Sequence, residues 1–152
     1  MKKLSESVWG DIRKKSLGKE DRKEDEINHL NPDEFCQYLR DRYETKDFKI
    51  DNEQDTRLSI PILNKFDSVT DCIHYNYKLN YISMNTDIKV YVPDLYKQLY
   101  ETFECEEVQM QSYVQLRIFP KDSHKCNNSF FVDVVDFIMN NAPQKYINIS
   151  LK

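Results

Sequence analysis

The sequence contains almost no glycine. Of its 152 residues only Gly10 and Gly18 are glycines, and both lie within the first 18 positions. Phosphate-binding loops, dinucleotide-binding fingerprints and nucleophile elbows all need glycines, because the backbone must approach a phosphate closely or turn sharply there. The chain beyond residue 18 therefore excludes these three classes of motif.

Cysteine pairs and long apolar runs are missing as well. No run approaches the roughly 18 apolar residues of a membrane span, and no apolar stretch follows Lys2 and Lys3, so we expect neither a membrane segment nor a secretory signal. The cysteines form no CxxC pair, which favours a reduced, cytosolic protein with free thiols over a disulfide scaffold. The four cysteines are Cys36, Cys72, Cys105 and Cys126.

The net charge is small and negative. The 22 Lys and Arg residues stand against 26 Asp and Glu residues, which gives a formal charge of −4. Proteins that follow a nucleic-acid backbone carry an excess of positive charge, so this balance disfavours nucleic acid as a partner. Aromatic residues make up 12% of the chain, whereas disordered chains of this charge contain few. We therefore expect a folded domain with one hydrophobic core.

The clearest helix start lies at Asn31. Asn31 can cap the helix, Pro32 suits its first position, and the two acids that follow interact favourably with its positive end. Leu30 and Phe35 occupy the positions of a hydrophobic staple. An apolar face then predicts a helix that continues to about residue 44.

Alternating apolar and polar residues predict five strands. Pro61 marks the first as an edge strand, because proline cannot donate a ladder hydrogen bond. The turn-forming residues 85–87 predict a hairpin between the second and third strands. In the fourth, Val108 is expected on the same face as Leu116. The predicted strands are Arg57–Leu63, Cys72–Met84, Ile88–Val92, Glu107–Phe119 and Ile147–Leu151.

Two further helices are predicted over Asp94–Glu104 and Ser129–Asn141, the second capped by Asn128. This order of elements favours an α+β fold, with a mainly antiparallel sheet of about five strands and two or three helices on one face. The polar residues at alternate strand positions favour a sheet whose other face is in water. We divide the chain into an N-terminal helical arm, 1–30, and a single α+β domain, 31–152.

The N-terminal arm has a helical periodicity of its own. Val8 and Ile12 stand four residues apart, and Trp9 widens the same apolar face. A helix of about twelve residues is only marginally stable alone, so it needs a surface to pack on. It either packs on its own domain or docks on a protein partner through Val8, Trp9 and Ile12, with Arg13 and Lys14 beside them. A helix at a membrane surface is disfavoured, because the apolar face is short.

The stretch SESVWGDIRKKSLGKEDRKED, Ser5–Asp25, resembles the N-terminal leader of small uncharacterised proteins of tailed bacteriophages and prophages, including phages of gut bacteria. It covers 21 of the 152 residues. The resemblance implies a phage-encoded protein whose leader docks onto a viral or host component. Residues 31–152 resemble no family that we recognise, so no catalytic residue is implied. The matching elements are Ser7-x-Trp9-x-Asp11-Ile12, the basic run Arg13–Lys15, Gly18, and Arg22-Lys23-Glu24-Asp25.

Two mirrored pairs of cysteine and histidine are candidate metal ligands. Cys72 and His74 stand two residues apart in a predicted strand and share one side, and His124 and Cys126 have the same spacing. Together they would supply a Cys2His2 set for zinc. The spacing is unusual, so we favour free thiols and surface histidines, with no metal or other cofactor. A Cys126 nucleophile with His74 as its base is disfavoured, because no oxyanion-hole motif accompanies it.

The acidic residues are scattered. Asp133 and Asp136 lie three residues apart on a predicted helix, and Asp67 and Asp71 flank a loop. A metal-dependent nuclease needs several acids that converge on one point. We expect these four side chains to be solvated instead.

One predicted strand face is rich in tyrosine. Tyr75, Tyr77 and Tyr81 alternate along it and could stack on single-stranded bases. Ile73 and Leu79 share the same face, which favours a place in the core. Base stacking therefore stays a minor interpretation.

These patterns favour a non-enzymatic protein-binding protein, a phage-type accessory or virion-associated protein in the host cytoplasm or the virion. Its N-terminal helix would dock on a viral or host protein. If the protein is instead an inhibitor of a host factor, helix 33–44 and the polar sheet face would bind that factor. The alternatives are a small metal-dependent hydrolase or nuclease and a module that binds single-stranded nucleic acid. A strand edge and the Trp9 helix each offer a route to a homo-oligomer.

Overall fold

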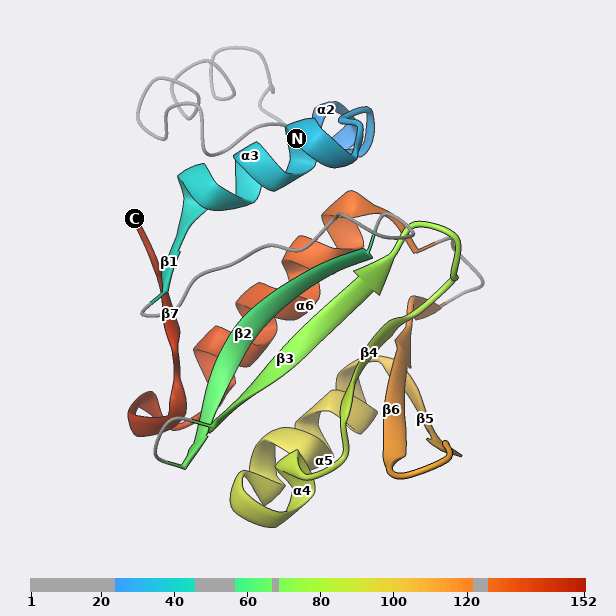
Figure 1. The fold of residues 1–152 in the computed structure, drawn as a ribbon, viewed down its shortest axis with the longest axis vertical. Helices are drawn as coiled ribbons and strands as arrows, with labels where there is room; N and C mark the ends of the chain where they lie inside the picture. Colours follow the sequence, from blue (N-terminus) through green and yellow to red (C-terminus); the bar gives the residue numbers. More distant parts are fainter. Residues whose placement is uncertain (1–23, 46–56, 67–68, 122–125) are drawn as a thin grey trace, which may run out of the picture.

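The computed structural model describes residues 24–45, 57–66, 69–121 and 126–152. These residues form an α+β fold with a five-stranded antiparallel sheet in the order β2-β3-β4-β6-β5 and a separate two-stranded sheet, β1-β7 (Figure 1). The predicted fold class is confirmed. The elements are α2 (Glu24–Asn28), α3 (Pro32–Arg42), β1 (Tyr43–Thr45), β2 (Arg57–Phe66), β3 (Val69–Asn76), β4 (Ile82–Asn85), α4 (Ile88–Tyr91), α5 (Pro93–Thr102), β5 (Glu104–Gln109), β6 (Val114–Phe119), α6 (Asn128–Asn141), the short 3-10 helix η3 (Gln144–Tyr146) and β7 (Ile149–Leu151).

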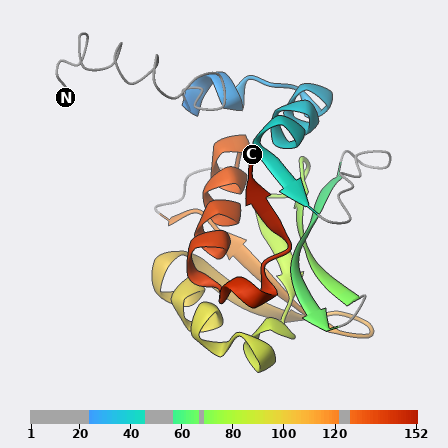
Figure 2. The same ribbon diagram turned by 90° about the vertical axis from the view of Figure 1, so that its left-hand side faces the viewer.

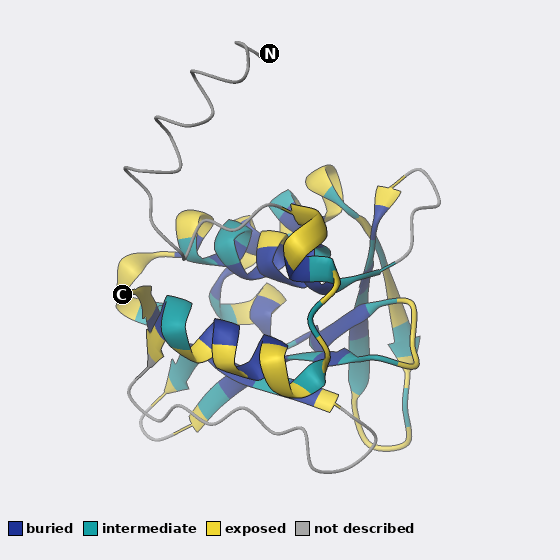
Figure 3. Cartoon of the chain, turned by 90° about the horizontal axis from the view of Figure 1, so that it is seen from above, coloured by how far each residue is buried: buried dark blue, intermediate teal, exposed yellow. Residues whose placement is uncertain are grey.

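The core lies between the main sheet and the helices on one side of it. Figure 2 shows α5 and α6 on the same side of the sheet. The helices carry buried residues on their inward sides and exposed residues on their outward sides (Figure 3). Phe35 of α3, Tyr75 of β3 and Phe131 of α6 meet at the centre, with the ring centroids of Tyr75 and Phe131 5.4 Å apart. None of the helices in the described ranges is long and apolar enough to cross a membrane.

The start of α3 follows its sequence signals. The Glu34 amide donates to Asn31 Oδ1 at 2.8 Å, and the Asn31 amide donates to Glu34 Oε1 at 3.0 Å. This reciprocal capping box satisfies two amides that would otherwise lack a partner. Leu30 is half-buried and packs against the core that contains Phe35, so the predicted staple positions are both used.

Residues 24–30 are part of the folded body. Ile27 of α2 is buried. Asn128 Nδ2 donates to the carbonyl oxygens of Ile27 at 2.8 Å and Leu30 at 3.1 Å, and the Ser129 amide donates to Asn28 Oδ1 at 2.8 Å. A boundary at residue 30 therefore falls inside packed structure. Asn128 is not the cap of α6, because Asn127 performs that role with its side chain on the Phe130 amide.

We expect Asn128→Ala to lower the free energy of unfolding by about 2 kcal/mol, because it removes the side-chain donor from the Leu30 carbonyl and one of the two donors to the Ile27 carbonyl, which also accepts from the Leu30 amide. Urea denaturation measures the effect. Asn140→Ala is the matched control on the exposed side of the same helix, and we expect it to change stability by less than about 0.5 kcal/mol. Equal costs for the two variants would contradict the anchoring role of Asn128.

The predicted strand Cys72–Met84 is wrong, because it is a hairpin. β3 ends at Asn76, the chain turns, and β4 begins at Ile82. The Asn76 side chain accepts from the Lys78 amide at 2.8 Å, and its carbonyl accepts from the Leu79 amide at 3.0 Å. This is an asparagine-based turn, which asparagine can supply without glycine.

The predicted strand Glu107–Phe119 is a hairpin as well. The four residues 110–113 separate β5 from β6, and the Met110 amide donates to the Tyr113 carbonyl at 2.8 Å. The register pairs Glu107 with Leu116 and Val108 with Gln115. Residues that pair across strands share a face. The predicted placement of Val108 beside Leu116 is therefore wrong, and Glu107 takes that side.

Two smaller predictions also fail. The segment Ile88–Val92 is not a strand, because residues 88–91 form the helical turn α4, closed by the Val92 amide on the Ile88 carbonyl at 2.8 Å. The predicted hairpin through residues 85–87 is therefore absent, and that turn leads from β4 into α4. The last strand, β7, pairs with β1 and not with the main sheet.

Pro61 does lie in an edge strand, since β2 ends the sheet order, and that prediction is confirmed.

Candidate functional site

The residues predicted to dock on a partner lie outside the described residues. Val8, Trp9, Ile12, Arg13 and Lys14 all belong to the segment 1–23. Docking through them stays a prediction.

The two predicted Cys/His pairs are not brought together. Cys72 and His74 lie on the face of β3 opposite to Tyr75, whereas Cys126 packs against the core on the Tyr75 side. His124 lies outside the described residues. Within those residues no three His, Cys, Asp or Glu side chains gather in a way that could hold a metal ion. The described chain therefore offers no metal centre to the alternative hydrolase.

The thiols are poor nucleophiles. Burial raises the pKa of the Cys105 and Cys126 thiols to about 12 and also raises the pKa of Cys72. The thiolate is the reactive form, so burial disfavours nucleophilic chemistry at these three thiols. His74 lies on the far side of the sheet from Cys126, so the two cannot form a nucleophile and base pair.

The predicted tyrosine face is divided, because Tyr75 and Tyr77 pack on the core side whereas Tyr81 lies beside Arg117 of the opposite face. Tyr75 is only 4% exposed, and its ring stacks on Tyr77 with centroids 4.7 Å apart. Tyr77 is half-buried and packs against the core. Neither ring is presented for base stacking, so the basis of the single-stranded nucleic-acid interpretation is lost.

Two of the acids expected to be solvated are engaged instead. Asp136 accepts from Arg42 Nη2 at 2.6 Å and from the Tyr43 hydroxyl at 2.7 Å. Asp71 is buried and accepts a hydrogen bond from the Tyr91 hydroxyl. Asp133 is exposed, and its carboxylate makes no hydrogen bond with the rest of the described chain. Asp67 lies outside that part of the chain.

The face of the main sheet opposite to the core, which we call the outer face, is a polar surface. A row of cross-strand neighbours runs over it from Ser59 through His74 and Ser83 to Arg117. The Ser59 hydroxyl and His74 Nδ1 are 2.7 Å apart. The guanidinium of Arg117 lies 4.4 Å from the ring centroid of Tyr81. These contacts hold the polar side chains in fixed positions.

A shallow hollow of about 290 Å³ lies on the outer face. Tyr113, 41% exposed, stands at its rim in the turn between β5 and β6. A solvent-exposed tyrosine beside ordered polar groups is typical of protein-binding surfaces. The other outer-face side chains that line the hollow are Thr70, Cys72, His74, Ser83, Asn85 and Gln115.

His74 is uncharged at neutral pH. Burial and, to a smaller extent, the positive charge of Arg57 lower the pKa of His74 from 6.5 to about 4. An imidazole with this pKa is a weak general base at pH 7. The hydrogen bond with Ser59 therefore orders the surface and does not prepare a nucleophile.

The burial of His74 should make the free energy of unfolding depend on pH. Because the unfolded histidine takes up a proton near pH 6.5 and the folded one only near pH 4, stability falls as the pH falls between these values. We expect His74 to account for at most about 3 kcal/mol of that loss. His74→Gln should flatten the unfolding free energy between pH 6.5 and 4, measured by urea denaturation, whereas an unchanged slope would contradict the burial of the imidazole.

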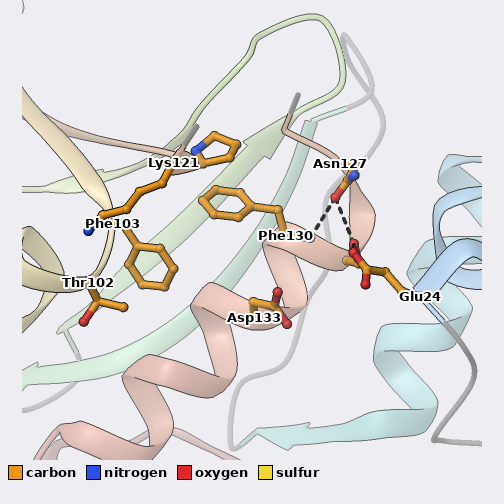
Figure 4. Close-up of a pocket in the computed structure, with 9 residues that line it drawn as sticks. Glu24, Thr102, Phe103, Lys121, Asn127, Phe130 and Asp133 are labelled. Carbon is orange, nitrogen blue, oxygen red and sulfur yellow. Dashed lines mark hydrogen bonds between the residues drawn. The ribbon is translucent and has the colours of Figure 1, made fainter. Parts of the chain in front are cut away.

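A second pocket, of about 390 Å³, lies between α2, the end of α5 and the start of α6 (Figure 4). Phe103 and Phe130 form an aromatic wall with centroids 5.7 Å apart. Glu24 accepts from the Ser129 hydroxyl at 3.2 Å. Partial burial of the Asp133 carboxyl group and the nearby Glu24 carboxylate raise the pKa of Asp133, although the residue as a whole is exposed. The pocket therefore combines an apolar wall with two carboxylates, Glu24 and Asp133, and one basic side chain, Lys121.

Comparisons with known proteins supply no relative. No family model matches the chain, and neither a curated protein nor a solved structure matches it.

Proposed function

We propose that the protein is a non-enzymatic protein-binding protein, of the phage accessory or virion-associated type, that acts in the host cytoplasm or in the virion. The observation that carries this proposal is the ordered polar outer face of the sheet with Tyr113 at its rim. The resemblance of Ser5–Asp25 to phage leader sequences supports the phage part of the proposal.

The outer face suits recognition of a protein partner, because hydrogen bonds already fix the positions of its side chains before binding. Arg117 Nε donates to Gln115 Oε1 at 2.7 Å, and Ser59 contacts His74 on the neighbouring strand. A surface whose rotamers are fixed before binding loses less side-chain entropy when a partner docks. Tyr113 adds a large contact area with few rotatable bonds.

The N-terminal segment adds a second contact in this proposal. Val8, Trp9 and Ile12 would enter a groove on the partner as one face of a helix, with Arg13 and Lys14 at its rim. The folded body begins no later than Glu24, because α2 packs on α6. A fragment of residues 24–152 therefore keeps the packed body and removes only the segment that precedes it.

The test is affinity capture from bacterial lysates with partners identified by mass spectrometry. The immobilised proteins are the full chain, the fragment 24–152, Trp9→Ala and Tyr113→Ala. Val90→Ala is the matched control, because Val90 is 79% exposed on α4, away from the outer face. We expect one protein to be captured by the full chain and by Val90→Ala, and at least tenfold less of it by Trp9→Ala or Tyr113→Ala.

The variants separate the two surfaces. A loss with Trp9→Ala and with the fragment, but not with Tyr113→Ala, would assign binding to the N-terminal segment alone. A loss with Tyr113→Ala alone would assign it to the outer face. Capture that is unchanged in all variants, or a turnover activity that needs His74, would contradict the proposal.

A further inference from the structure

The two edges of the main sheet differ. At the β2 edge, the Asn148 amide donates to the Ile62 carbonyl at 3.0 Å, and Asn148 Nδ2 donates to the Pro61 carbonyl at 2.8 Å. Residues near the C-terminus therefore cover this edge, and Pro61 has no amide hydrogen to offer. At the other end of the sheet, β5 pairs only with β6 among the described strands (Figure 1).

The register shows which backbone groups of β5 point away from the sheet. Met110 and Tyr113 form a hydrogen-bonded pair at the turn, and such pairs alternate with non-hydrogen-bonded ones along an antiparallel ladder. The pairs of Cys105, Glu107 and Gln109 are then the non-hydrogen-bonded ones. Their amide and carbonyl groups point to the free edge, and no described backbone group pairs with them there.

The outer side of this edge is acidic. Glu106 lies opposite Arg117 and therefore on the outer face, and Glu104, two residues earlier, shares that side. Both side chains are exposed, and neither makes an ion pair within the described part of the chain. Their spacing matches alternate residues of a neighbouring strand, which would also face this side.

The inner side of the edge is aromatic. α5 lies beside β5, and the Tyr96 hydroxyl donates to Glu107, which Lys89 also contacts at 3.0 Å. Tyr100 is 40% exposed, and its ring centroid lies 5.2 Å from that of Tyr96. The two tyrosines thus form an apolar shelf beside the free edge, while the charge of Glu107 is already compensated.

We propose that the free edge of β5 binds an extended segment of the protein partner, in which basic residues alternate with apolar ones. The segment adds a sixth strand by hydrogen bonds to the backbone of Cys105, Glu107 and Gln109. Its basic side chains meet Glu104 and Glu106, and its apolar side chains lie on the Tyr96 and Tyr100 shelf. This inference rests on the proposed function and specifies the chemistry of the partner.

Charge disfavours a second copy of β5 as the occupant. Pairing two such strands would bring the carboxylates of Glu104 and Glu106 against those of the other copy, and like charges on neighbouring strands destabilise a sheet. The same carboxylates that oppose self-association favour a basic strand.

The test is a titration of the ¹⁵N-labelled full chain with the peptide acetyl-TKVKVKT-amide, followed by amide chemical shifts. We expect shifts concentrated at the amides of Cys105, Glu107 and Gln109, and none with acetyl-TEVEVET-amide. Glu104→Lys combined with Glu106→Lys should weaken binding about tenfold or more. Glu101→Lys, an exposed charge reversal on α5, is the matched control and should not weaken it more than the general change in net charge does.

A backbone variant separates strand pairing from simple charge attraction. Gln109→Pro removes one outward amide, and proline is tolerated in an edge strand where the amide faces away from the ladder. We expect this variant to weaken peptide binding several-fold without a change in charge. Full affinity in Gln109→Pro, or shifts that spread over all acidic surfaces, would overturn strand addition.

Other occupants give different results. If the amides of Cys105, Glu107 and Gln109 resist hydrogen exchange in the free protein, the edge is already covered and the inference is overturned. Protection that rises with protein concentration would identify a second copy as the occupant. Protection that does not depend on concentration would identify a segment of the same chain. Failure of the peptide while Trp9→Ala and Tyr113→Ala still abolish capture would overturn this edge site alone. Peptide binding without any captured protein would overturn the proposed function but not the edge site.

Discussion

Replacing Phe131 with alanine is expected to lower the free energy of unfolding by about 3 to 5 kcal/mol, the largest effect of any single substitution that we consider. Phe131 is fully buried. Its ring stacks on Tyr75 and meets Phe35 edge-on at 6.2 Å, so one side chain joins α6, β3 and α3. Alanine would leave a cavity between three elements, which cannot collapse together without moving the sheet.

Since a domain of this kind is stable by only about 5 to 15 kcal/mol, this loss would bring the protein close to unfolding at physiological temperature. Urea denaturation followed by far-ultraviolet circular dichroism measures it. Phe137→Ala is the matched control, because Phe137 lies on the same helix but is only half-buried, against Phe103. We expect it to cost less than half as much, and an equal cost would place the centre of the core elsewhere.

The parts of the fold that the sequence predicts are those with local signals. α3 begins where Asn31, Pro32 and Glu34 predict, because a capping box is formed by residues three positions apart. α5 and α6 follow from apolar residues that repeat every three or four positions. The α+β class follows from the order of these helices and the strand-like segments between them.

The hairpins could not be predicted because tight turns without glycine leave the alternation almost intact. The register of β5 and β6 pairs each odd-numbered residue of one strand with an even-numbered residue of the other. The residues that face the core are therefore odd-numbered in β5 and even-numbered in β6. A pattern of period two in the sequence shows no break at Gln111 and Ser112. The unbroken pattern therefore predicts Val108 on the side of Leu116, whereas the register pairs Val108 with Gln115.

The candidate surfaces were predicted only in part. The polar side of β3, with His74 and Asn76, was recognised from alternation and does form the outer face. The sequence does not reveal the free edge of β5, because the alternation predicts one strand over Glu107–Phe119 with Tyr113 inside it. Strand order depends on contacts between distant residues, which no local pattern specifies.

The contacts of Asp136 join residues that are distant in the sequence, so no local pattern predicts them. Their removal is the second large loss of stability that we expect. Asp136 accepts from Arg42 and from the Tyr43 hydroxyl, 94 and 93 positions away. The side chains of Arg42 and Asp136 are 16% and 29% exposed. We expect Asp136→Ala to cost about 3 kcal/mol, because it removes a carboxylate that pairs with the largely buried Arg42 guanidinium and takes the acceptor from the buried Tyr43 hydroxyl.

The neighbouring acid Asp133 supplies the control on the same helix. It has no hydrogen-bond partner among the described residues, and burial with the nearby Glu24 raises its pKa, so the folded state disfavours its charged form. Above the pKa of the unfolded carboxyl this shift opposes folding, and Asp133→Asn should therefore leave stability at pH 7 unchanged or slightly higher. Thermal denaturation of both variants at pH 7 compares them.

The contacts among Arg42, Tyr43 and Asp136 join α3 and β1 to α6. Asp136→Ala should therefore also loosen the β1-β7 pair, which would be seen as faster amide exchange in these two strands. Similar melting temperatures for the two variants would show that these contacts add little to the fold.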